Sequence, residues 1–164
     1  MTLVHNALSD RAAEVVNMSI MRKHVGGSGV FNFDSVKRYK ELRKAKSFDF
    51  GAIETVSVTT IRTDDLLPLI GFKKAVLKMD IEGSEHKAIR SAKKLFDQVD
   101  IEIAFLEWVW YIPAWGFRAG LAEGKEMGDF FYSRGYKAYN SWFDTKQLND
   151  KQIDWKGDIF WKKP

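Results

Sequence analysis

The chain has 164 residues, of which 45% are hydrophobic and 29% are charged, a balance typical of one folded domain and not of a disordered tail or a membrane protein. It contains no cysteine, which excludes disulfides, thiolate nucleophiles and thiolate metal sites. The 26 lysines and arginines exceed the 22 acidic residues by only four, so the charge does not indicate a nucleic-acid partner.

The compartment is predicted from three further features of the chain. No apolar run reaches the ~20 residues of a membrane-spanning helix, so we expect no membrane span. Residues 1–10 do not show the basic start and apolar stretch of a signal peptide. Together with the absence of cysteine, these features favour a cytoplasmic location.

Strand and helix patterns alternate along the chain, which predicts an α/β fold. The apolar centres of residues 75–81 and 101–107 indicate strands covered on both faces. Residues 136–140 and 158–162 are expected to pair as an antiparallel edge. In chain order we expect strands at 1–4, 14–20, 56–61, 75–81, 101–107, 136–140 and 158–162, helices at 64–69, 84–96 and 124–133, and a basic helix or loop at 36–46.

Acidic side chains gather where the strand at 75–81 turns into a helix. Asp80 lies near the end of this strand, Glu82 and Glu85 follow it, Gly83 permits a tight turn, and Glu107 ends the next strand. Ligands of open α/β sheets bind at the carboxyl ends of strands, and neighbouring strands lie ~5 Å apart. Such carboxylates could hold a metal, orient a substrate hydroxyl or accept a proton. The alternative is that they cap helix starts and solvate the rim of the sheet.

Residues 78–85, Lys-Met-Asp-Ile-Glu-Gly-Ser-Glu, resemble the signature K-[IM]-D-[IV]-E-G-x-E of the FkbM-type methyltransferases. Further stretches resemble the same family in the same order, and the resemblance runs from about Val4 to about Tyr139. These stretches are residues 6–10 (Asn-Ala-Leu-Ser-Asp), 26–29 (Gly-Gly-Ser-Gly), 58–67 and 88–92, followed by the acidic strand end at Glu107.

The resemblance implies an S-adenosylmethionine-dependent enzyme with a Rossmann-like sheet. It would transfer a methyl group to an oxygen or nitrogen of a small molecule or glycan by in-line displacement. On this reading Asp80 orients or deprotonates the acceptor, and Glu82, Glu107 and the general-base candidate His86 are further catalytic candidates.

The resemblance also places the cofactor's adenine beside residues 6–10. Ala7 would line the ring, and Asn6 or Asp10 could reach its amino group; the alternative is a turn that ends a strand. We expect no histidine-based metal site, because His5, His24 and His86 do not have the i, i+3 or i, i+4 spacing of helix-borne ligands.

The family pattern begins here at its third strand, without the glycine turn that holds the cofactor's methionine part. We therefore expect residues 1–164 to form a single, N-terminally truncated domain whose Rossmann-like sheet lacks its first two strands. The strand at 75–81 should then expose an edge open to a partner strand or to an oligomer. The alternative function is a non-catalytic interaction domain, or a gene-model fragment, that retains the methyltransferase scaffold.

Two other segments have more than one interpretation. The basic run at 37–46 could bind phosphate or form a solvated helix surface, and it lacks the aromatic alternation of nucleic-acid binders. The aromatic segment 108–117 could cover a bulky substrate or pack beneath a loop.

Overall fold

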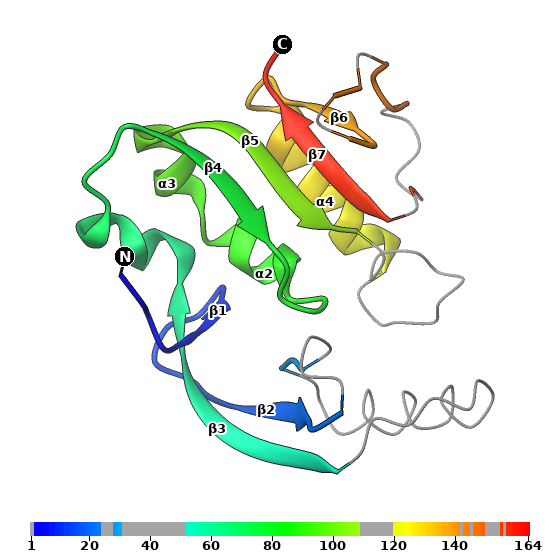
Figure 1. The fold of residues 1–164 in the computed structure, drawn as a ribbon. Coiled ribbons are helices and arrows are strands. Elements are labelled where there is room, and N and C mark those ends of the chain that lie inside the picture. The colour runs from blue at the N-terminus through cyan, green and yellow to red at the C-terminus, as the bar shows by residue number, and fades with distance from the viewer. Residues whose placement is uncertain are drawn as a thin grey trace, which may run out of the picture.

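The structure is a computed structural model that describes residues 2–23, 28–30, 52–108, 120–141, 143–144, 146–149, 155 and 157–164. Its strands form two sheets, one of order β1-β3-β2 and one of order β4-β5-β7-β6 (Figure 1). The predicted α/β class is therefore confirmed. In chain order the elements are β1 (Ala7–Ser9), β2 (Val15–Met21), β3 (Ile53–Arg62), the 3-10 helix η2 (Thr63–Leu69), β4 (Lys74–Met79), α2 (Glu85–Arg90), α3 (Lys93–Gln98), β5 (Asp100–Glu107), α4 (Leu121–Tyr132), β6 (Lys137–Tyr139) and β7 (Asp158–Lys162).

The three-stranded sheet is built on β3, whose alternating sequence predicts a strand. β2 pairs with it antiparallel, and β1 pairs with its end in parallel. The strand expected at residues 1–4 is wrong: residues 2–6 lie outside any strand, and β1 begins at Ala7, where its backbone pairs with Thr60. Pairing with a strand more than 50 residues away thus decides where β1 starts.

The four-stranded sheet places β5 between β4, which runs parallel to it, and β7, which runs antiparallel. The predicted pairing of β6 with β7 is confirmed. Among the described residues β4 pairs only with β5, so its other edge is open, as expected. Leu8 of β1 and Phe72 line an apolar groove of about 410 Å³ along this edge.

The hydrophobic core lies on one face of the four-stranded sheet, beneath α2, α3 and α4 (Figure 1). The Trp161 indole is fully buried and stacks on the Phe131 ring at a centroid distance of 4.6 Å. On the other face Ile103 and Phe105 are half-buried, and Val76 is 66% exposed. The expectation that both faces are covered is therefore met on one face only in the described part of the chain.

The single helix expected at 84–96 is instead two helices, α2 and α3, which are separated at Ser91 and Ala92. A continuous helix would join the Leu95 amide to the Ser91 carbonyl. The Asp64 side chain instead accepts the Leu95 N–H at 2.9 Å, and the Asp64 amide donates to the Ser91 carbonyl at 3.0 Å. The apolar periodicity of the sequence does not predict these two hydrogen bonds of Asp64 in η2.

The Ser91 hydroxyl joins the helix break to two other elements. It is 3% exposed, accepts the Thr63 N–H at 3.0 Å, and lies 2.9 Å from the Ser9 carbonyl oxygen. We expect Ser91→Ala to lower the free energy of unfolding by about 1–3 kcal/mol, because buried polar groups lose their partner. Urea denaturation measures this change. Ser133→Ala, which removes an exposed hydroxyl bonded to the Phe130 carbonyl, should have a much smaller effect, and equal losses would contradict the prediction.

The helix expected at 124–133 is confirmed as α4, but it begins three residues earlier. Glu123 accepts the Gly120 N–H at 2.8 Å and so caps the true start. The predicted stop is correct, since Gly135 has a φ of +81°, which favours glycine. None of the described helices has the length and apolar character needed to cross a bilayer.

Candidate functional site

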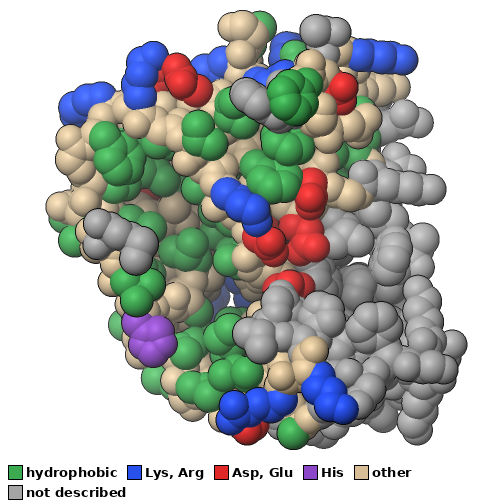
Figure 2. Space-filling model, viewed as in Figure 1, with side chains coloured by type: hydrophobic (Ala, Val, Ile, Leu, Met, Phe, Trp, Pro, Cys, Tyr) green, Lys and Arg blue, Asp and Glu red, His purple; other side chains and the backbone are tan. Residues whose placement is uncertain are grey.

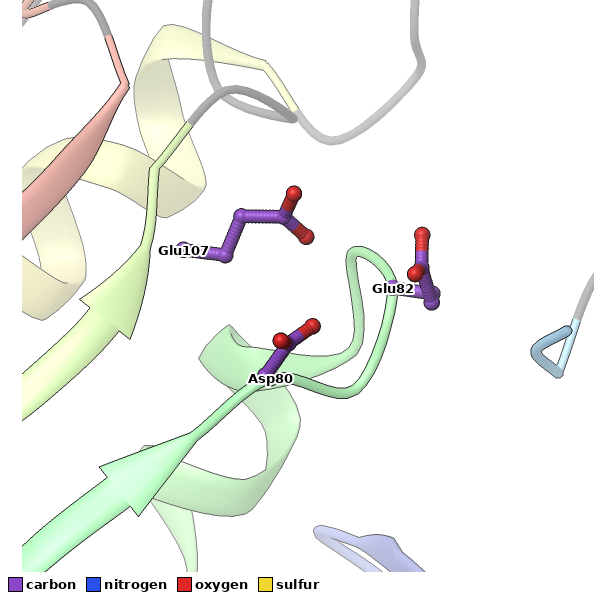
Figure 3. Close-up of side chains that lie close together, drawn as sticks. All are labelled: Asp80, Glu82 and Glu107. Atoms are coloured by element: carbon purple, nitrogen blue, oxygen red, sulfur yellow. The ribbon is translucent and has the colours of Figure 1, made fainter. Parts of the chain in front are cut away.

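Three carboxylates meet at the carboxyl ends of β4 and β5. Asp80 follows β4 directly, Glu82 lies on the turn after it, and Glu107 ends β5 (Figure 3). One oxygen from each carboxylate lies within 4.8 Å of the others. Figure 2 shows acidic side chains gathered on this face of the molecule beside apolar ones. The sequence predicted this group correctly because parallel neighbouring strands end at the same edge. We call the three residues the acidic rim.

The turn from Asp80 to Gly83, here called the acidic bend, has an unusual backbone. Glu82 has a φ of +55° and Gly83 a φ of +89°. The left-handed conformation suits glycine but costs another residue on the order of 1 kcal/mol. The Glu82 side chain rises from this turn, and its carboxylate lies within 4.8 Å of those of Asp80 and Glu107 (Figure 3).

The carboxylates of the acidic rim differ in their electrostatic surroundings. Burial, followed by the charges of Glu107 and Asp80, raises the pKa of Glu82 to about 8. Asp80, by contrast, accepts a hydrogen bond from Lys78 Nζ at 2.8 Å. That bond raises the pKa of Lys78. The rim therefore offers a charge-paired carboxylate beside one that titrates near neutral pH.

A pocket of about 350 Å³ joins the acidic bend to β1. The bend forms one side, and the residues before and within β1 form the other. Ser28 and Gly29, from the glycine- and serine-rich stretch, also line it. Its apolar walls include Ala7, Leu8, Leu66 and Ile81, and its polar side chains include Asn6, Asp80 and Ser84.

The three residues predicted beside the adenine lie close together but differ in their contacts. Asn6 and Ala7 line the pocket. Asp10 lines a neighbouring pocket and accepts a hydrogen bond from Arg90 at 2.7 Å. Partial burial raises the pKa of Asp10, but the Arg90 hydrogen bond and charge outweigh burial, and the pKa lies below its usual value. Asp10 is thus held toward α2.

His86, which follows the signature, and Glu85, which ends it, lie away from the acidic rim. His86 is half-buried in α2, and neither the acidic rim nor the pocket includes it. Burial, and then the charges of Lys87 and Arg90, lower the pKa of His86, so the imidazole is neutral at physiological pH. Glu85, expected to border the site, is fully buried instead. Ser84 occupies the first cap position of α2, but its side chain makes no capping hydrogen bond.

Several predictions fall outside the described residues, and some pocket residues were not predicted. The basic run at 37–46, residues 26–27 and the aromatic segment after Trp108 lie outside the described residues. Met18, which lines the pocket, carries no local signal of function in the sequence. It lies on β2 and reaches the pocket as part of the three-stranded sheet.

Carboxylate oxygens are the ligands that Mg²⁺ and Ca²⁺ prefer, so the acidic rim could hold such an ion. The same oxygens can instead orient a hydroxyl group and take its proton, and the raised pKa of Glu82 suits that second role at neutral pH.

Comparison with known proteins tests the resemblance. A search of curated proteins gives no match, and a search of solved structures gives none either. The family model of the methyltransferase FkbM domain matches residues 6–138, which include Asn6, the acidic bend and Glu107. The matched segment covers most of the chain and contains every lining residue of the pocket except Val4. The chain therefore belongs to the FkbM methyltransferase domain family.

Proposed function

We propose that this protein is an S-adenosylmethionine-dependent methyltransferase that acts on an oxygen or nitrogen of a small molecule or glycan. One observation carries the proposal: a single pocket holds Asn6 and Ala7 on one side and Asp80 on the other. The residues expected beside the adenine and the residue expected at the acceptor thus face the same space. The family match is consistent with this chemistry.

The pocket fits the adenosine part of the cofactor. Its volume of about 350 Å³ lies in the range of small-molecule sites. Ala7, Leu8 and Ile81 offer apolar walls to a ring. Asn6 donates its amide N–H to the Thr59 carbonyl at 3.0 Å, so its amide oxygen would be the group that accepts a hydrogen bond from the adenine amino group. The strand order β4-β5-β7-β6, with β7 antiparallel to both of its neighbours, supports a Rossmann-like arrangement of the methyltransferase type.

The acidic rim prepares the acceptor. S-adenosylmethionine, when bound, supplies an electrophilic methyl group on a sulfonium centre. Asp80, held by Lys78, orients the acceptor hydroxyl or amine. Glu82 would take the proton that the acceptor loses, because a base with a pKa near the working pH is most effective. Glu107 lies beside Glu82, and its charge helps to raise the pKa of that base.

The acceptor would approach over the open face of the four-stranded sheet. The Phe105 and Phe160 rings stack there at a centroid distance of 4.4 Å, each two positions along its strand from the rim end. Half-buried aromatic rings beside carboxylates offer both apolar contact and hydrogen-bond acceptors. This combination suits a small molecule or glycan with hydroxyl groups.

Titration calorimetry with S-adenosylmethionine tests the proposal. We expect binding at tens of micromolar, about 6 kcal/mol. Ala7→Phe should abolish the heat because the new ring fills the pocket. Ala12→Phe is the matched control, since Ala12 is exposed outside the pocket. No heat with the wild-type protein would reject the enzyme in favour of a non-catalytic domain that retains the scaffold.

A further inference from the structure

Glu85 is the one acidic residue of the signature that the structure removes from solvent. Its side chain is fully buried in the first turn of α2. Burial of a carboxylate is costly unless hydrogen bonds compensate it. Glu85 Oε1 accepts the Ile81 N–H at 2.8 Å, across the acidic bend. The side chain is therefore directed at the backbone and not at the acceptor.

The bonded amide lies at the centre of the acidic bend. Ile81 separates Asp80 from Glu82, and the Ile81 carbonyl accepts the Ser84 N–H at 3.3 Å. Both polar backbone groups of Ile81 are thus held by the start of α2. The next residue, Glu82, has a φ of +55°, a conformation that persists only where surrounding contacts impose it.

We infer that Glu85 is the positioning residue of the acidic bend: its hydrogen bond to the Ile81 amide fixes the directions of Asp80 and Glu82. The catalytic part of this inference rests on the proposed function. Glu85 acts through the Ile81 backbone, so it governs first the placement of the rim carboxylates on either side of Ile81. Of the residues proposed beside the adenine, Glu85 bonds Ile81, whereas Asn6, Ala7 and Leu8 line the pocket from another part of the chain.

Two variants of Glu85 distinguish the effect of its hydrogen bond from the effect of its side-chain packing. Glu85→Gln keeps the shape and an acceptor oxygen, whereas Glu85→Met keeps the approximate shape without that acceptor. We expect Glu85→Met to lower kcat about 100-fold, since small misplacements have effects of this size, with KM for S-adenosylmethionine within about 3-fold. Glu85→Gln should restore most of kcat. Equal kcat values for both variants would overturn the inference.

The control removes a similar hydrogen bond elsewhere. Glu123 accepts the Gly120 N–H at the start of α4, so Glu123→Met loses a carboxylate–backbone bond without touching the acidic bend. We expect its kcat to stay within about 3-fold of wild type, because the rim geometry that sets the rate is unchanged. If kcat of Glu123→Met fell as far as kcat of Glu85→Met, loss of a carboxylate–backbone hydrogen bond outside the acidic bend would have the same effect. That result would overturn the specific role of Glu85.

Hydrogen exchange of the Ile81 amide, measured by NMR, decides the inference without activity. We expect slow exchange in the wild-type protein and in Glu85→Gln, and faster exchange in Glu85→Met. If Glu85→Met does not fold, the wild-type protein and Glu85→Gln still test the inference. Rapid exchange of the Ile81 amide in either of them would overturn it. If the wild-type protein lacks turnover and cofactor binding, the proposed function fails while the exchange result still decides the role of Glu85.

Discussion

Asp80→Asn is expected to lower methyl-transfer turnover about 100- to 10,000-fold, the range for loss of an acid–base or orienting group. The amide has a similar shape but neither the charge nor the second acceptor oxygen, so it cannot orient or deprotonate the acceptor equally well. The folded structure should persist, because the Lys78–Asp80 pair is exposed and exposed pairs contribute at most about 1 kcal/mol. Initial rates with saturating S-adenosylmethionine, together with a urea denaturation curve, measure both effects.

A matched substitution distinguishes this effect from a general loss of charge. Asp129 lies on α4, away from the acidic rim, and forms an exposed pair with Lys125. Asp129→Asn should leave turnover unchanged. Wild-type turnover in Asp80→Asn would reject the assignment of Asp80, whereas a loss in both variants would indicate a nonspecific electrostatic effect.

Glu82→Gln is expected to remove the pH dependence of the reaction. With a pKa of about 8, Glu82 is mostly protonated at pH 6 and ionised at pH 9, so kcat/KM of the wild-type protein should rise with a midpoint near pH 8. Glu82→Gln should lose this rise and be about 100-fold slower at pH 9, because it has no base at this position. A wild-type profile that is flat between pH 6 and 9 would contradict the role of Glu82.

The same substitution has an effect on stability that needs no activity. The pKa of Glu82 is raised from 4.5 in the unfolded chain to about 8 in the folded protein. Between these values the folded state holds a proton that the unfolded state has lost, so stability decreases as pH rises. Glu82→Gln should match the wild type below pH 4.5 and be more stable at pH 9, by on the order of 1–2 kcal/mol after solvent screening.

Thermal unfolding of the wild type and of Glu82→Gln between pH 4 and pH 9 measures how their stability difference changes with pH. Glu54→Gln is a suitable control, since Glu54 is an exposed carboxylate on β3 paired with Arg22. A stability gain for Glu82→Gln that is equally large at pH 4 would exclude ionisation of Glu82 as the cause.

Sequence by itself determined the acidic rim. Asp80 and Glu107 end two strands whose apolar centres are unmistakable, and parallel neighbours end at one edge whatever the remainder of the chain does. It also determined the pairing of β6 with β7 and the stop at Gly135, since alternation and a left-handed glycine are local properties. The family resemblance likewise depended on several short stretches in the same order as in the family, with the signature at 78–85 among them, and the family match confirmed it.

The tertiary structure alone decided the features that depend on distant partners. The break between α2 and α3 exists because Asp64 bonds both the Leu95 N–H and the Ser91 carbonyl, which would bond each other in a continuous helix. The hydrophobic periodicity of the sequence does not reveal this contact. The sequence position of Glu85 suggests the rim, whereas the structure buries its side chain and bonds it to the Ile81 amide. The pocket likewise has walls from distant segments, with Asn6 beside β1 of one sheet and Asp80 after β4 of the other, and these meet only in the folded structure. The local pattern of acidic and apolar residues predicts strands, helices and turns. Hydrogen bonds between segments that are distant in the chain decide where the individual side chains point.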